Sequence, residues 1–173
     1  TISSALIQGL GNPMSSKKIF ENHALKLGKL VGNLLSIEMG ARLSIVKLDR
    51  HAVSKVFTQL PQVKEGDLVE WNAFTNADDL MQTLEKYNKR APLESKVEVT
   101  AIVDALAHGR TFGAGNTKHL RLLKFNRKQR EGKVPVDLVQ DMTNTWFDEN
   151  IVMLTQAIEK IRIALDYDKK ELT

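Results

Sequence analysis

The sequence of 173 residues predicts a mainly α-helical fold with one β-hairpin near residues 119–139. Apolar residues recur at steps of three and four in several long segments, which is the period of an amphipathic helix. Beyond residue 115 the pattern changes to the alternation that is typical of strands. A chain of this length with 42% hydrophobic residues can bury one sizeable core. We therefore expect a single domain over residues 1–173.

The first periodic element is a long amphipathic helix from about Ser16 to Leu48. Glu38 interrupts its apolar stripe, and Arg42, four residues later, is the natural partner of that carboxylate. On a second line small residues recur every four positions from Gly28 to Ser44, which predicts close packing of another helix or, alternatively, a groove. The predicted buried stripe consists of Phe20, Ala24, Leu27, Val31, Leu34, Ala41, Ile45 and Leu48.

A short helix after residue 52 is expected to end at Pro61, and residues 62–75 then form a connection. Trp71 and Phe74 are expected to pin this connection to the core, although an exposed aromatic pair would instead indicate a partner surface. The next helix is expected to start near Asn76, because asparagine is a good N-cap.

The following helix carries His108 in its last turn. It is expected to begin with a capping box at Ser95 and to end at Gly109. His108 lies four residues after Asp104 and two before Arg110, an arrangement suited to acid–base chemistry on a phosphate. The alternative is that His108 is a cationic cap at the negative end of the helix dipole, helped by Asp104.

Two alternating segments, residues 119–125 and 134–139, flank a polar loop and predict an antiparallel hairpin. Pro135 favours an edge position for the second strand, because proline cannot donate to a neighbouring strand. A last amphipathic helix is expected to open at Thr145.

Basic residues are concentrated around the predicted hairpin. Residues 110–133 contain eight basic residues and one acid, a net charge of +7, whereas the whole chain carries +4 and the rest of it therefore −3. Such a strip fits phosphate backbones, but it also fits an ordinary solvated surface. The candidate nucleic-acid-binding residues are Arg121, Lys124, Arg127, Lys128, Arg130 and Lys133.

Several classes of chemistry lack their motifs. There is no cysteine, so disulfides, thiolate metal sites and thiol catalysis are excluded, and a reducing, cytoplasmic setting is expected. The sequence has no Gly-rich phosphate loop, no dinucleotide fingerprint and no paired-histidine motif, so we expect neither cofactor nor metal. His23, His51 and His119 are expected at the surface or at caps. No apolar run is long enough to span a membrane.

The order of these elements resembles the HEPN (higher eukaryotes and prokaryotes nucleotide-binding) superfamily over most of residues 16–168. The resemblance depends on Asp-Ala-Leu-Ala-His-Gly-Arg at residues 104–110, Leu-Arg-Leu-Leu-Lys-Phe at 120–125 and Met-Thr-Asn-Thr-Trp-Phe at 142–147. It implies a helical bundle that dimerises, in a family that includes metal-independent RNases of toxin–antitoxin and phage-defence systems. It also implies that His108 is the catalytic histidine and that Asp104 occupies the polar position of the motif.

The chain departs from the family motif, Arg-x(4–6)-His, in which an arginine precedes the histidine on the same helix. Ala101, Ile102 and Val103 stand where that arginine would be. Because that arginine orients the phosphate, we expect little or no RNase activity. We expect instead a homodimer, packed partly through the His108 helix, that binds RNA or a protein partner. The partner classes are a cognate antitoxin and a nucleotidyltransferase-like protein.

Two alternatives stay open. In the first, the protein is an active metal-independent endoribonuclease, in which His108 takes the 2′-hydroxyl proton and Arg110, or a basic residue of the hairpin, steadies the phosphate. In the second, it is a purely structural interaction module.

Overall fold

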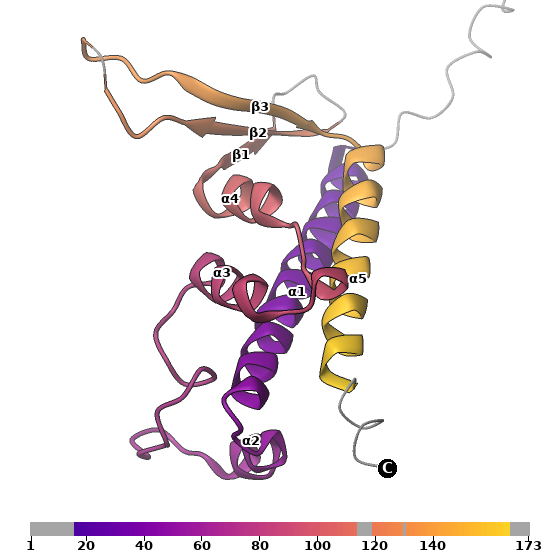
Figure 1. The fold of residues 1–173 in the computed structure, drawn as a ribbon. Helices are drawn as coiled ribbons and strands as arrows, with labels where there is room; N and C mark the ends of the chain where they lie inside the picture. The colour runs from indigo at the N-terminus through magenta and orange to yellow at the C-terminus, as the bar shows by residue number, and fades with distance from the viewer. Residues whose placement is uncertain (1–15, 114–118, 130, 167–173) are drawn as a thin grey trace, which may run out of the picture.

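The computed structural model describes residues 16–113, 119–129 and 131–166, and it confirms a mainly α-helical fold with a small antiparallel sheet (Figure 1). The elements follow in the order α1 (Ser16–Leu48), α2 (Val53–Gln59), the 3-10 turn η1 (Leu60–Gln62), α3 (Leu80–Arg90), the 3-10 turn η2 (Leu93–Ser95), α4 (Thr100–His108), β1 (Arg110–Gly113), β2 (Leu120–Phe125), β3 (Val136–Met142) and α5 (Asn144–Asp166).

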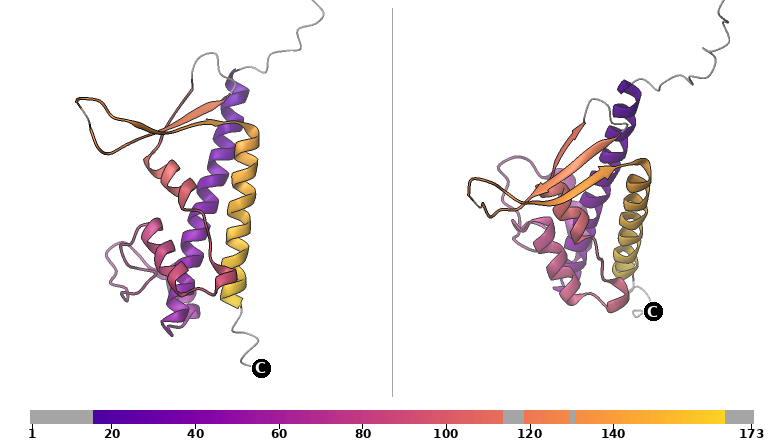
Figure 2. Two further views of the ribbon diagram at one scale, coloured as in Figure 1. Left: turned by 45° about the horizontal axis from the view of Figure 1, so that its top comes forward. Right: turned by 90° about the horizontal axis from the view of Figure 1, so that it is seen from above.

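The two long helices, α1 and α5, lie side by side and form the spine of the fold (Figure 2). Helices α3 and α4 lie on one side of this pair, and the sheet lies across its end next to the start of α5 (Figures 1 and 2). The core between these layers is continuous. Its largest fully buried side chains include Tyr87, Phe147, Ile37, Leu122 and Leu154.

The buried line of α1 differs from the predicted stripe. Leu34, Ala41 and Ile45 are buried as expected, but Phe20, Val31 and Leu48 are exposed. Steps of three and four are both compatible with a helix face, so a long helix with many apolar residues offers more than one stripe. Packing against α5 and α3 selects the line that includes Leu30 and Ile37.

Among the glycines of the small-residue line of α1, Gly40 packs closely against another helix. Gly40 faces α5, where an added Cβ would lie 2.8 Å from Cγ2 of Ile161. At Gly28 and Gly32 an added Cβ would meet nothing within 4 Å, so both glycines lie on an open face of the helix. The prediction of close packing is therefore correct for Gly40 and wrong within this chain for Gly28 and Gly32.

Helix α3 starts a few residues later than expected. Asp79 is its N-cap and forms a reciprocal capping box with Gln82. The Asn76 side chain instead accepts a hydrogen bond of 2.8 Å from the buried guanidinium of Arg42. The same guanidinium forms the predicted ion pair with Glu38. The connection before α3 also differs from expectation, because Trp71 is 79% exposed and does not pin it to the core.

Helix α4 starts later than the capping box at Ser95 implied. Ser95 is buried in η2, and α4 begins at Thr100 with no side-chain cap on Val99. Gly109 ends the helix in an extended conformation with φ of −78°, which does not require glycine. The requirement is space, because a Cβ there would lie 2.3 Å from the carbonyl oxygen of Ala105 and 2.4 Å from Cδ1 of Leu122.

Gly109→Ala is expected to destabilise the protein by about 1–3 kcal/mol, because the backbone of α4 and the core side chain of Leu122 cannot both give way. Thr155→Ala is the control and is expected to change stability by under about 0.7 kcal/mol, because it places alanine at an exposed position in the middle of α5. Urea unfolding of both variants measures the difference. Equal effects of the two substitutions would contradict the close packing at Gly109.

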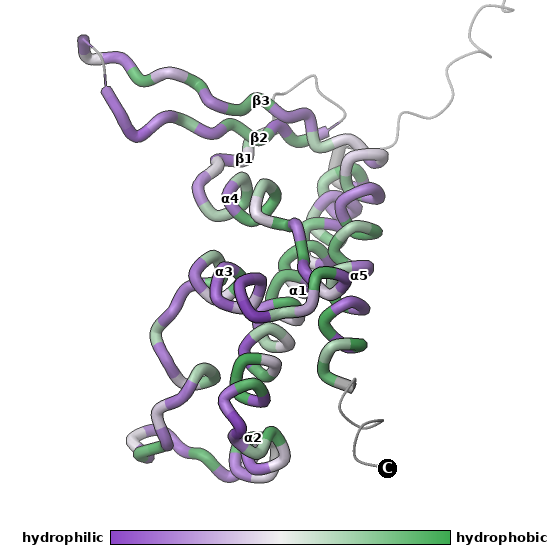
Figure 3. The backbone as a smooth tube through the Cα atoms, in the orientation of Figure 1, coloured by the Kyte–Doolittle hydropathy of each residue, from purple (hydrophilic) through white to green (hydrophobic). Residues whose placement is uncertain are grey.

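Among the described residues the sheet has three strands, one more than the predicted hairpin. Strand β2 is central, and it pairs antiparallel with both β1 and β3. The predicted hairpin is β2–β3, and Pro135 directly precedes β3, an edge strand, as expected. The sequence pattern does not reveal β1, because its four residues, Arg110–Gly113, are too few to show an alternation and are all exposed. The part of the hairpin farthest from α5 is largely hydrophilic (Figure 3).

Two remaining expectations need correction. The cap of α5 is Thr143 rather than Thr145, because Thr143 Oγ1 accepts from the backbone N–H of Trp146. His23 is not at the surface but buried beside the ring of Phe147, and burial lowers its pKa. Among the residues described, no helix has the length and apolar character needed to cross a membrane.

Candidate nucleic-acid interface

The end of α4, the start of β1 and the loop of the β2–β3 hairpin surround one open groove of about 940 Å³. The hairpin is held over α4 because Leu122, on β2, packs against Gly109 and Arg110 pairs with Leu123 across the strands. The groove is lined by Asp104, Ala107, His108, Gly109, Arg110, Lys124, Phe125, Asn126, Arg127, Lys128, Val134 and Asp137. It therefore contains all three predicted catalytic residues.

His108 meets a basic residue of the hairpin loop in this groove. Nη2 of Arg127 lies 3.3 Å from Nε2 of the imidazole. A guanidinium only donates hydrogen bonds, so this contact is a hydrogen bond when Nε2 is the unprotonated ring nitrogen. The one lone pair of Nε2 then accepts from Arg127, so His108 can act as a general base only when Arg127 turns away from it. Arg127 thus brings a guanidinium to the histidine, although no arginine precedes the histidine on α4.

Asp104 forms an ion pair with Nζ of Lys124 on β2. The sequence suggested that Asp104 assists His108 along the helix, but the contact in the structure joins it to Lys124 instead. The pair lies in the groove and ties α4 to the sheet. Two of the predicted residues are therefore adjacent, with opposite charges that partly cancel.

Arg110 leaves α4 as the first residue of β1. The carbon at the centre of its guanidinium lies 5.8 Å from the centroid of the Phe125 ring, a distance that allows a cation–π interaction. The pairing of β2 with β3 shifts at this point, because Asp137 is an extra residue on β3 between the partners of Lys124 and Phe125. Both Lys124 and Phe125 line the groove. Arg110 is thereby held over an aromatic ring at the groove wall.

The predicted basic residues separate into two sets. Lys124, Arg127 and Lys128 line the groove. Arg121 lies outside it and pairs with Asp141 of β3, at 2.7 Å, which lowers the pKa of that carboxyl group. Lys133 is exposed and also lies outside the groove, and Arg130 is outside the described residues.

Sequence reasoning missed Asn126 and Asp137. The Asn126 side chain accepts from the backbone N–H of Lys128 and donates to the Asp137 carboxylate, at 2.8 and 3.1 Å. Asparagine often accepts a hydrogen bond from the backbone two residues ahead and so stabilises a turn. The position of Asn126 at the start of a polar loop was therefore the sequence feature that could have identified its role. These bonds shape the loop that carries Arg127 and Lys128.

The groove is moderately cationic and fits no metal site. Four cationic side chains and two carboxylates line it, with His108 counted as neutral. Across the described part of the chain, no group of three or more His, Cys, Asp or Glu side chains is placed to hold a metal ion.

Comparison with known proteins found no matching family model, no matching curated protein and no matching solved structure. The HEPN assignment accordingly stays a prediction that depends on the three motifs at residues 104–110, 120–125 and 142–147.

Proposed function

We propose that this groove binds the phosphate backbone of single-stranded RNA, in a HEPN-like protein with little or no RNase activity. The observation that carries the proposal is the contact of 3.3 Å between Arg127 and His108, with the cationic Lys124, Lys128 and Arg110 lining the same groove. Guanidinium and ammonium groups that converge on one groove suit successive phosphates. The choice of RNA rests on the HEPN resemblance.

The test is binding of a labelled single-stranded RNA at several salt concentrations. The double variant Arg127→Glu, Lys128→Glu is expected to bind at least about tenfold more weakly, and its salt slope should be smaller by about 0.7 for each phosphate that it no longer neutralises. The control is Lys55→Glu, Lys64→Glu, which makes the same charge change on exposed residues in and after α2, far from the hairpin (Figure 1). An equal decrease of affinity in both double variants would contradict a localised site.

A second candidate function, endoribonuclease activity, is favoured by the same pair of side chains. In this reaction Arg127 turns from His108 to the phosphate, and the freed lone pair of His108 Nε2 takes the proton of a 2′-hydroxyl, whose oxygen attacks the adjacent phosphorus. The bond from phosphorus to the 5′-oxygen breaks, and water or the protonated imidazole supplies a proton to that oxygen. The products are a 2′,3′-cyclic phosphate and a 5′-hydroxyl, and Arg127 stabilises the negative charge that develops on the phosphate.

A protein partner is the proposal that remains if the RNA experiments are negative. If the protein neither binds nor cleaves RNA, the groove and hairpin are a protein-interaction module, for which a cognate antitoxin or a nucleotidyltransferase-like protein is the proposed partner. Isolation of the protein with its chromosomal neighbours would identify such a partner.

We also propose a homodimer, through a different face from the one that the sequence indicated. The Asp104 and His108 face of α4, expected to need a second copy for cover, is contacted by Lys124 and Arg127 of the same chain. The open face of α1 suits a dimer better, because its apolar and small residues follow heptad spacing. These residues are Leu25, Gly28, Gly32, Leu35 and Met39.

Sedimentation is expected to show a dimer at high micromolar concentration, and Leu35→Glu is expected to shift it to monomer. Val152→Glu is the matched control, because it places the same charge on an exposed apolar position of α5. A monomeric unaltered protein would contradict the proposal.

A further inference from the structure

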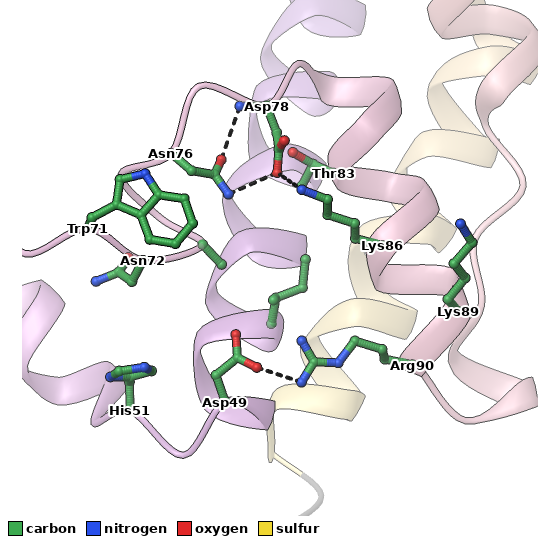
Figure 4. A pocket seen from close by; sticks show the side chains of 12 residues that line it. Asp49, His51, Trp71, Asn72, Asn76, Asp78, Thr83, Lys86, Lys89 and Arg90 are labelled. Atoms are coloured by element: carbon green, nitrogen blue, oxygen red, sulfur yellow. Dashed lines mark hydrogen bonds and ion pairs between the residues drawn. The ribbon is translucent and has the colours of Figure 1, made fainter.

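A second pocket lies where the C-terminal end of α1, the segment of residues 71–78 and α3 meet (Figure 4). Its volume of about 390 Å³ is within the range that small ligands occupy. The indole of Trp71 lies on one side, and Lys86 and Arg90 of α3 lie on the other (Figure 4). The pocket shares no lining residue with the RNA groove.

Trp71 is exposed, but the chain around it is braced. The side chain of Asn72 accepts from the backbone N–H of Phe74 at 2.8 Å, and the Thr75 hydroxyl donates to the carbonyl of Glu70 at 2.7 Å. Arg42 donates to a carbonyl of the same segment, that of Ala73. A large planar ring is thus presented on a fixed segment while 79% exposed, which suits stacking on a planar ligand.

Thr83 gives an independent indication of a ligand. It lines the pocket from α3, is only 2% exposed, and its Oγ1 has no hydrogen-bond partner among the residues described. An unsatisfied buried hydroxyl costs about 1–3 kcal/mol, so native structures rarely keep one without a reason. A ligand with a polar edge in the pocket would satisfy this group.

The wall opposite Trp71 is cationic. Lys86 pairs with Asp78, and Arg90 pairs with Asp49 at 2.7 Å, so each head group is held in place at the pocket. An ammonium has three donors and a guanidinium five, so donors remain for an anion after each of these pairs forms. Lys89, the third cation of this wall, is largely exposed and pairs with a residue of its own helix, Glu85.

We propose that this pocket binds a nucleoside monophosphate. The base stacks on Trp71, a polar edge of the base bonds the Thr83 hydroxyl, and the phosphate contacts Lys86 and Arg90. A planar heteroaromatic ring joined to a phosphate is the ligand class that uses all three features, and it fits the volume. The site is separate from the RNA groove and does not depend on RNA binding there.

The experiment follows the two tryptophan indole N–H resonances of the labelled full chain, with Trp146→Phe to assign them. Addition of AMP is expected to shift the Trp71 resonance to saturation and to leave that of Trp146, at the start of α5, unchanged. Adenosine, which lacks the phosphate, is expected to bind at least about tenfold more weakly, the loss of about 1.4 kcal/mol in affinity. Inorganic phosphate alone is expected to leave the Trp71 indole unshifted.

Two variants separate binding from structure. Thr83→Val is expected to weaken AMP binding at least about tenfold. Without AMP it should raise the melting temperature, because it removes an unsatisfied hydroxyl and keeps the shape of the side chain. Lys86→Gln is expected to lower affinity for AMP to that for adenosine, whereas Lys55→Gln changes neither.

The proposal is overturned if AMP causes no saturable shift up to about 10 mM, or if Thr83→Val and Lys86→Gln both bind AMP as the unaltered protein does. A pocket that serves a protein partner would give the first of these results. The Arg127→Glu, Lys128→Glu variant should keep full AMP binding, so failure at this pocket and failure at the RNA groove are distinguishable.

Discussion

His108→Ala is expected to abolish cleavage of single-stranded RNA and to leave RNA affinity within about twofold of that of the unaltered protein. A positioned general base contributes about 10² to 10⁴ in rate, and His108 Nε2 is the atom that contacts Arg127 in the groove. Affinity depends instead on the cationic side chains, which this variant keeps. The unaltered protein is expected to cleave slowly, because its arginine comes from a hairpin loop rather than from α4.

The measurement is a cleavage assay with a chelator present, in which the products are identified by mass. Arg127→Lys keeps the charge but loses the planar fork, so we expect most activity to be lost while much of the binding remains. Arg121→Lys is the matched control, because Arg121 is a hairpin residue that pairs with Asp141 outside the groove. Cleavage indifferent to His108 would indicate contamination or another site. Strong cleavage that disappears in His108→Ala and Arg127→Lys would establish the endoribonuclease function over the binding function.

Arg42→Met is expected to destabilise the protein by about 3–5 kcal/mol, the usual cost of removing one partner from a buried charged network. Its guanidinium bonds the Glu38 carboxylate at 2.9 Å, the Asn76 side chain at 2.8 Å and the carbonyls of Ala73 and Asp78. These groups tie the segment before α3 to α1. Methionine fills similar space but offers no donor, so the acceptors stay unsatisfied.

For a domain of this size the destabilisation corresponds to a decrease of melting temperature of about 6–20 °C. Arg162→Met is the control, because Arg162 forms an exposed pair with Glu159 on α5 and is expected to change stability by under about 1 kcal/mol. Hydrogen exchange of the segment around Trp71 should increase in Arg42→Met more than exchange of α5. A melting temperature within about 2 °C of the unaltered protein would contradict this role of Arg42.

Much of the helical fold could be predicted, and the boundaries of the helices less well. Periodicity located α1 and α5, and the i to i+4 spacing identified the Glu38 and Arg42 pair. The predicted start of α3 was wrong because several capping residues precede it, and tertiary bonds decide among them. Asn76 bonds Arg42 from another element, which left Asp79 as the cap. The predicted start of α4 was wrong because Ser95 is buried in η2 and the helix begins later, without a side-chain cap.

The candidate groove was predictable in its residue types but not in its contacts. His108, Arg110 and the basic hairpin were visible as a motif and a charge cluster. Strand register decided which basic residues enter the groove, since Arg121 and Lys124 lie on opposite faces of β2 and only Lys124 turns toward α4.

The sequence by itself determined the mainly helical class, the hairpin, the absence of thiol chemistry and the histidine of interest, because local periodicity and composition carry this information. Only the tertiary structure decided that Arg127 meets His108, that Asp104 pairs with Lys124, and that Trp71 stands exposed beside the pocket that Thr83 lines. The physical reason is that each of these contacts joins elements distant along the chain. Their meeting depends on how the hairpin closes over α4 and how Arg42 holds the segment before α3, which no local pattern encodes.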